Sequence, residues 1–220
     1  MEQIRLSPST LNLFAECGRC FWLHVNKGIH RPSAPFPSLP SGMDNVLKPY
    51  YDKYRLAGKL PPELEGKIEG KLFPDISKIN RWRNWRTGLE YFDIKRNAKL
   101  IGALDDLLIV GGKYAPLDYK TRGGTIKEDS HTYYQLQLDL YALLLEGSGL
   151  PPATFGYLVF YSPREMTPGG VTNFTVEPVK VETSAESGRA VFEKAVELLR
   201  SEIPPHHSSC EYGLWQNENF

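Results

Sequence analysis

The stretch that organises the chain is LIGALDDLLIVGGKYAPLDYK, residues 100–120. Gly111-Gly112 separates two apolar runs, and such a break is typical of a β-hairpin with a two-residue turn. We therefore expect two antiparallel strands in which Val110 pairs with Lys113. Pro116 lies inside the second run, where a proline favours a bulge that would shift the register.

The same register places two carboxylates face to face. Asp105 falls directly opposite Asp118, and Lys120 shares their face because side chains alternate along a strand. Directly opposed like charges destabilise a sheet, whereas carboxylate oxygens are ligands that Mg²⁺ and Mn²⁺ prefer. The pattern therefore predicts a divalent metal held by the two aspartates, with the lysine holding a water for attack on phosphorus. The competing interpretation makes both aspartates solvated strand-end residues and the lysine their ion-pair partner.

Other parts of the chain predict helices and strands around this hairpin. Ser7 and Pro8 are typical of a helix cap and a first helical position, and leucines recur at helical spacing between His131 and Leu145. Four prolines predict a loop over residues 31–42. Further helices are expected over residues 44–56 and 184–201, and further strands over 155–161 and 171–181. This order of elements predicts one mixed α/β domain over residues 1–220.

Three motifs follow one another along the chain: Gly102-Ala-Leu-Asp105, Asp118-Tyr-Lys120 and Gln137-Leu-Asp-Leu-Tyr141. Together they resemble the GxxD, (D/E)xK and QxxxY motifs of the PD-(D/E)XK nucleases. The set is most similar to the RecB-like branch, which includes AddB nuclease domains and CRISPR-associated adaptation nucleases. The resemblance implies a restriction-endonuclease-like α/β fold, with a mixed central sheet flanked by helices. It also implies metal-dependent hydrolysis of DNA that leaves a 5′-phosphate.

Residue by residue, the resemblance implies roles for these motifs. Asp105 and Asp118 would bind Mg²⁺ or Mn²⁺, and Lys120 would position the attacking water. Gln137 and Tyr141, four residues apart on one helix, would face the same way beside the metal site.

One ligand of the family has no clear counterpart in this sequence. The related nucleases usually carry a histidine on a helix before GxxD, but His24 and His30 lie too near the Cys17–Cys20 segment to fit it. Asp44, at the start of the helix after the proline-rich loop, could supply an oxygen ligand instead. An acidic residue there is equally typical of a side chain that stabilises a helix N-terminus.

The cysteines suggest a second metal site. Cys17-Gly-Arg-Cys20 has the spacing of a ligand pair, and His207-Ser-Ser-Cys210 repeats it near the other end of the chain. These four residues would complete a Cys₃His zinc site joining the two ends, with His206 as a competitor for His207. Related nucleases often bind an iron–sulfur cluster there through four cysteines, and the three present here favour zinc over a cluster. The alternative is two buried thiols and one surface thiol without a metal.

A basic and aromatic segment predicts the DNA contact. Residues 78–99 carry seven basic and two acidic side chains, interleaved with aromatic rings. Guanidinium groups neutralise phosphates and rings stack on bases. The alternative is an amphipathic helix that buries its tryptophans. The candidate DNA-binding residues are Arg81, Trp82, Arg83, Trp85, Arg86 and Arg122.

Composition limits the remaining possibilities. Lys+Arg and Asp+Glu are 26 each in 220 residues, so any DNA-binding surface must be local. The sequence shows no bilayer-length apolar run, no signal-peptide core and an odd number of cysteines, so we expect a cytoplasmic protein. The predicted function is a DNA nuclease in repair, recombination or CRISPR adaptation. The alternatives are a catalytically silent DNA-binding module and a subunit that acts only within a larger nuclease complex.

Overall fold

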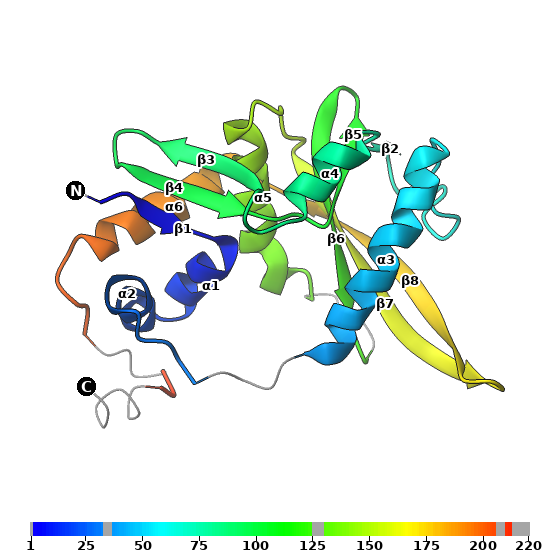
Figure 1. The fold of residues 1–220 in the computed structure, drawn as a ribbon, viewed down its shortest axis with the longest axis horizontal. Helices are drawn as coiled ribbons and strands as arrows, with labels where there is room; N and C mark the ends of the chain where they lie inside the picture. Colours follow the sequence, from blue (N-terminus) through cyan, green and yellow to red (C-terminus); the bar gives the residue numbers. More distant parts are fainter. Residues whose placement is uncertain (1, 33–36, 125–129, 206–209, 213–220) are drawn as a thin grey trace.

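The computed structural model describes residues 2–32, 37–124, 130–205 and 210–212, which form two β-sheets surrounded by helices (Figure 1). The helices are α1 (Pro8–Glu16), α2 (Gly18–Lys27), α3 (Ser38–Leu56), α4 (Ile76–Trp82), the 3₁₀ turn η1 (Thr132–Tyr134), α5 (Gln135–Gly147) and α6 (Ala185–Leu199). The strands are β1 (Ile4–Leu6), β2 (Lys71–Leu72), β3 (Leu89–Asp93), β4 (Ala98–Gly102), β5 (Asp106–Val110), β6 (Lys113–Thr121), β7 (Phe155–Thr167) and β8 (Val171–Glu182).

The larger sheet has five strands in the order β2-β5-β6-β7-β8. Its strands β6 and β7 run parallel, and the other neighbouring strands run antiparallel. This confirms the expected mixed central sheet. A smaller sheet, β1-β4-β3, was not indicated by the sequence patterns.

The β5–β6 hairpin lies at the centre of the larger sheet, between two core clusters. Leu47 and Tyr51 of α3 pack in one cluster with Leu117 of β6. The leucines of α5 pack in the other cluster with Leu107 of β5. Residues 138–145 of α5 are buried throughout, and each fully buried leucine contributes about 1.5–3 kcal/mol. Alternate side chains of the hairpin therefore face α3 and α5.

The register of the hairpin agrees with the prediction. Gly111-Gly112 forms the turn with φ angles of 57° and 81°, a conformation that glycine adopts without strain, and Val110 pairs with Lys113. The bulge expected at Pro116 is wrong, because this residue pairs in register with Leu107. Pairing of β6 with β7 begins only at residue 117, so the proline precedes the parallel ladder.

Helix boundaries follow the predicted caps at some positions and not at others. Ser7 caps α1 through a bond of 3.2 Å from the Thr10 N–H, with Pro8 as the first helical residue. The expected start of α3 at Asp44 is wrong, because the helix begins at Ser38. Its Pro40 falls in the first turn, where a missing N–H removes no helical hydrogen bond. Strand β7 extends to residue 167, beyond the expected 161. Across the described ranges, no helix combines the length and apolar character needed to span a bilayer.

Candidate active site

Asp105 and Asp118 lie level with each other across the β5–β6 hairpin. The last ladder pair joins Asp106 to Leu117, so the register continues to Asp105, directly before β5. Oδ2 of Asp105 accepts a hydrogen bond of 3.3 Å from the backbone N–H of Tyr119. The side chain of Asp105 is 20% exposed, whereas that of Asp118 is 2% exposed. The site is therefore buried at Asp118 on β6 and partly exposed at Asp105, directly before β5.

Three side chains contact the Asp118 carboxylate. The Lys120 ammonium forms an ion pair with Oδ2 of Asp118 and donates a hydrogen bond of 3.1 Å to Oε1 of Gln137. Nε2 of Gln137 donates to Oδ1 of Asp118 at 3.0 Å and to the Tyr141 hydroxyl at 2.6 Å. The Tyr141 hydroxyl lies 3.4 Å from the same Oδ1 atom. The second and third motifs singled out in the sequence therefore meet at one carboxylate, and Asp105 of the first motif bonds the backbone of the next residue, Tyr119.

Burial changes the protonation of this site. Desolvation is the largest influence and, together with the charge of Asp105, raises the pKa of Asp118 to about 7, although Lys120 acts in the opposite direction. Burial also raises the pKa of Tyr141 well above its usual value, reinforced by Asp118 and Asp105. Tyr141 is therefore a neutral hydroxyl at physiological pH, and Asp118 titrates close to that pH.

Lys48 of α3 is a member of the site that the sequence analysis missed. Its ammonium lies 3.1 Å from Oδ1 of Asp105 and 3.2 Å from Oδ2 of Asp44. Burial opposes the charged form, but the two carboxylates outweigh it and raise the pKa of Lys48. Lys48 thus links Asp44 to Asp105. The i,i+4 spacing of Asp44 and Lys48 could have predicted their ion pair from the sequence.

Comparison with known proteins identifies the family. The model of the PD-(D/E)XK nuclease superfamily matches residues 43–216, which include α3, the hairpin and α5. The chain belongs to the PD-(D/E)XK nuclease superfamily. This membership suggests nuclease activity and implies DNA as the substrate.

A solved structure described as "Crystal structure of SSO0001" aligns with a TM-score of 0.48 and 14% identity, over 99% of this chain and 86% of that chain. No curated protein matches the chain. The superfamily assignment therefore depends on the family match.

The PD-(D/E)XK hairpin carries a second charge cluster on its other face. Asp106 is fully buried, and both of its carboxylate oxygens lie 2.6 Å from Nη2 of Arg55. Oδ2 of Asp106 also accepts bonds from Nη2 of Arg83 at 3.1 Å and from the Tyr119 hydroxyl at 2.6 Å. Asp52 of α3 bonds both arginines, at 3.1 Å and 2.8 Å. The sequence analysis missed this network, which ties α3 and the end of α4 to β5.

Two of the six expected DNA-binding side chains face inward in this PD-(D/E)XK protein. The Arg83 side chain is 8% exposed, and its Nε donates a hydrogen bond of 2.8 Å to the backbone oxygen of Asp105. Trp82 packs against Phe73, with 5.2 Å between ring centroids. The structure therefore leaves these two side chains only partly exposed, unlike those of their neighbours Arg81, Trp85 and Arg86.

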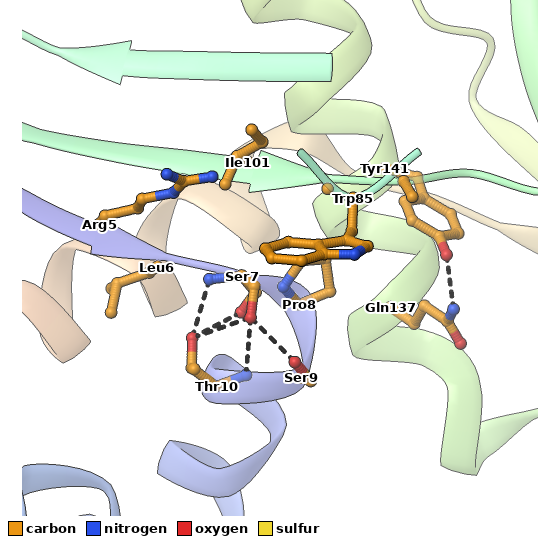
Figure 2. A pocket seen from close by; sticks show the side chains of 12 residues that line it. Arg5, Leu6, Ser7, Pro8, Ser9, Thr10, Trp85, Ile101, Gln137 and Tyr141 are labelled. Atoms are coloured by element: carbon orange, nitrogen blue, oxygen red, sulfur yellow. Dashed lines mark hydrogen bonds between the residues drawn. The ribbon is translucent and has the colours of Figure 1, made fainter. Parts of the chain in front are cut away.

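The other expected DNA-binding residues lie nearer the surface. Arg81 and Arg86 are exposed, Trp85 is 64% exposed, and the Arg86 guanidinium lies 4.6 Å from the Trp85 ring centroid. Arg122 donates a hydrogen bond of 2.6 Å to Oγ of Ser130. Trp85 also lines a pocket that includes the Asp118 partners on α5 (Figure 2).

The three cysteines form a separate cluster. The sulfur atoms of Cys17, Cys20 and Cys210 all lie within 4.8 Å of one another. Burial raises the pKa of the Cys20 thiol to about 11, and the other two thiols add to this shift. At Cys17, burial is outweighed by hydrogen bonds involving Cys20 and nearby backbone, which lower the pKa. The predicted fourth ligand, His207 or His206, lies outside the described residues.

Proposed function

We propose that this chain is a Mg²⁺- or Mn²⁺-dependent deoxyribonuclease that hydrolyses phosphodiester bonds. The observation that carries the proposal is the constellation of Asp105, Asp118 and Lys120 on one face of the hairpin. Gln137 and Tyr141 support it, because both bond the same carboxylate from α5. We further propose that residues 1–220 act as one nuclease-like domain of the RecB-like branch.

The donor chemistry of the site fits a divalent cation. Asp105 and Asp118 supply carboxylate oxygens, which Mg²⁺ and Mn²⁺ prefer, and Asp44 offers another beyond Lys48. Two ammonium groups, of Lys48 and Lys120, already ion-pair with these carboxylates. Burial, the largest influence, and the charge of Asp105 nevertheless raise the pKa of Asp118 to about 7, and a bound cation would favour its ionised form. In our proposal Asp105 and Asp118 hold the metal, with Asp44 as a further ligand.

In the proposed reaction, the side chains around Asp118 position the reactants. Lys120 orients the attacking water, and its ammonium is held between Asp118 and Gln137. Tyr141 keeps its proton and donates to Oδ1 of Asp118, and Oδ2, which ion-pairs with Lys120, is the oxygen that would also bind the cation. When bound, the metal supplies positive charge that offsets the charge developing on the phosphate oxygens. Cleavage between the phosphorus and the 3′ oxygen leaves a 5′-phosphate.

The DNA would approach over the surface next to Trp85. Arg81 and Arg86 are exposed there, so they can neutralise phosphates, and the Trp85 ring is available for stacking. Arg122, two residues after Lys120, would add a further positive charge in this proposal. This proposal leaves out Trp82 and Arg83, because of their inward placement.

The decisive test is cleavage of end-labelled linear and closed circular DNA, with and without Mn²⁺. Asp118→Asn should abolish cleavage, whereas Asp139→Asn should not. Asp139 of α5 is a suitable control because it too is a buried aspartate with a raised pKa, and its carboxylate bonds Gln135 and the Ser184 backbone instead. Lys120→Ala should also lose cleavage while it retains much of the metal binding. Wild-type cleavage by pure Asp118→Asn protein would contradict the proposal.

One observation favours a second candidate function, a catalytically silent DNA-binding module. The Lys48 ammonium already ion-pairs with Asp105. In a site that no longer binds metal, such an ammonium group would take the place of the metal's positive charge. The two candidates differ in one measurement, since a silent module would bind DNA but show no Mn²⁺-dependent cleavage. Action as a subunit of a repair, recombination or CRISPR adaptation complex, and a cytoplasmic location, stay predictions.

For the cysteine cluster we propose a structural Zn²⁺ site rather than an iron–sulfur cluster. Three thiols within 4.8 Å of one another provide three of the four ligands that zinc needs. His207 would supply the fourth ligand, with His206 as the alternative. The chemistry supports this choice, because zinc accepts a mixed sulfur and nitrogen ligand set.

A further inference from the structure

A pocket lies between the start of α1, the end of β4 and the beginning of α5 (Figure 2). Its volume is about 690 Å³, within the range of about 300–1,000 Å³ typical of small-ligand sites. Trp85 and Arg5 are among the labelled side chains around it, and Gln137 and Tyr141 form its wall toward the catalytic carboxylates. The pocket therefore adjoins the candidate active site through these two side chains, which also contact Asp118.

The lining of this pocket suits an anion attached to an aromatic ring. None of the twelve residues that line it is acidic, and Arg5 supplies a positive charge. The Ser9 hydroxyl offers a polar group at the start of α1, where it lies 2.9 Å from the Ser7 hydroxyl. The Trp85 indole is 64% exposed, and Arg86 adds a second positive charge beside the ring. A nucleotide matches both features, because its phosphate can pair with the arginines and its base can stack on the Trp85 ring.

The position of the pocket indicates which nucleotide it would hold. Gln137 and Tyr141 bond Asp118 and also line the pocket. A strand whose scissile phosphate lies at Asp118 would therefore carry an adjoining nucleotide into the pocket. The face of a base that stacks on Trp85 must be uncovered, and inside a duplex both faces are covered by neighbouring base pairs.

We propose that this pocket is a subsite for one unpaired nucleotide adjoining the scissile phosphate, with its base stacked on Trp85 and its phosphate facing Arg5. This inference rests on the proposed nuclease function, since it takes the phosphate at Asp118 as the point of cleavage. It assigns Trp85 a defined nucleotide position, rather than a general contribution to a basic surface.

The test measures binding of a short oligonucleotide by fluorescence anisotropy in Ca²⁺, for the wild type, Trp85→Ala and Trp85→Phe. A single abasic residue is placed at each position of the oligonucleotide in turn. Loss of one base–aromatic stack corresponds to a weakening of about 5- to 150-fold. We expect this loss in Trp85→Ala and much less in Trp85→Phe, whose ring can still stack. Met166→Ala is the control, because Met166 is 71% exposed and lies on the β7–β8 hairpin, far from α1 (Figure 1).

The abasic series gives a double-mutant cycle for the subsite. At one position, the abasic residue should weaken binding to the wild type but cause no further loss in Trp85→Ala. Arg5→Gln should lower the logarithmic salt slope by about 0.7, the value for one phosphate contact on a single strand. The subsite would be overturned if the abasic residue and Trp85→Ala weakened binding independently at every position of the oligonucleotide. It would also be overturned if Trp85→Ala weakened binding of blunt duplex DNA equally. If the wild type still cleaves DNA with Mn²⁺, that outcome leaves the proposed function intact; absence of both DNA binding and cleavage would overturn the two together.

Discussion

Asp105 and Asp106 are consecutive residues whose carboxylates lie on opposite faces of the β5–β6 hairpin. Asp105 is partly exposed and faces Lys48, whereas Asp106 is fully buried against Arg55 and Arg83. The alternation of side chains along the chain separates the two groups. One face therefore carries the candidate chemistry, and the other carries the charges that hold α3 and α4 to the sheet.

This separation predicts opposite consequences for two similar substitutions. Asp105→Asn should abolish Mn²⁺-dependent cleavage with little change in stability, because it removes a charge that faces Asp118. Asp106→Asn should lower the free energy of unfolding by about 3–5 kcal/mol, because it leaves two buried arginines without their shared carboxylate. Urea unfolding and a cleavage assay on both variants check the prediction. Equal destabilisation by the two substitutions would contradict it.

The raised pKa of Asp118 predicts how stability depends on pH. The folded metal-free protein binds a proton at this carboxyl up to about pH 7, whereas an unfolded chain releases it near the ordinary aspartate pKa of 3.8. The folded state therefore holds more protons in this window, and stability falls as pH rises from about 4 to 7. Each tenfold difference in proton affinity between the two states corresponds to at most about 1.4 kcal/mol. Metal-free thermal unfolding of the wild type and Asp118→Asn at pH 5 and pH 8 should show a larger fall for the wild type.

Lys48 should compete with the divalent cation. In Lys48→Ala, Asp44 and Asp105 lose their shared ammonium, so Mn²⁺ should bind about five- to tenfold more tightly, equivalent to about 1 kcal/mol for a partly exposed ion pair. Isothermal titration calorimetry measures this affinity without any need for cleavage. Lys53→Ala is the matched control, an exposed lysine on the same helix. Weaker Mn²⁺ binding by Lys48→Ala would mean that the lysine supports the site rather than competes for it.

The cysteine cluster should hold about one zinc ion per chain. The purified protein should be colourless and contain zinc by elemental analysis, and chelation should lower its thermal stability. Cys20→Ser should reproduce the effect of chelation, because it removes one of the three clustered thiols. A broad visible absorbance near 400 nm together with iron would instead indicate an iron–sulfur cluster.

Local sequence patterns could predict those parts of the site whose residues lie close together in the sequence, within one hairpin or one helix. The glycine pair at residues 111 and 112 defines the turn, and alternation along the strands then relates Asp105 to Asp118 and Lys120. Helical spacing likewise relates Gln137 to Tyr141. In each case a regular backbone period converts residue number into relative position.

The missed features depend on contacts between elements that are distant in sequence. Arg55 and Asp106 are 51 residues apart, and no period relates a helix residue to a strand residue at that separation. Lys48 could have been paired with Asp44, but its contact with Asp105 depends on how α3 packs against the sheet. The Trp85 pocket also escaped prediction, because its walls come from α1, β4 and α5 together.

Helix α2 packs against residues from near the other end of the chain. Trp22 donates to the backbone oxygen of Ser201, and Asn26 donates to that of Leu199, across 179 and 173 residues. At translation rates of about 5–20 residues per second, α2 waits roughly 10–35 s for these partners to be synthesised. During that time the side chains of Phe21 and Leu23, buried in the folded protein, lack part of their cover. Helix α2 is thus synthesised early but is among the last elements to be completely packed, and the nascent chain leaves part of its apolar surface uncovered until then.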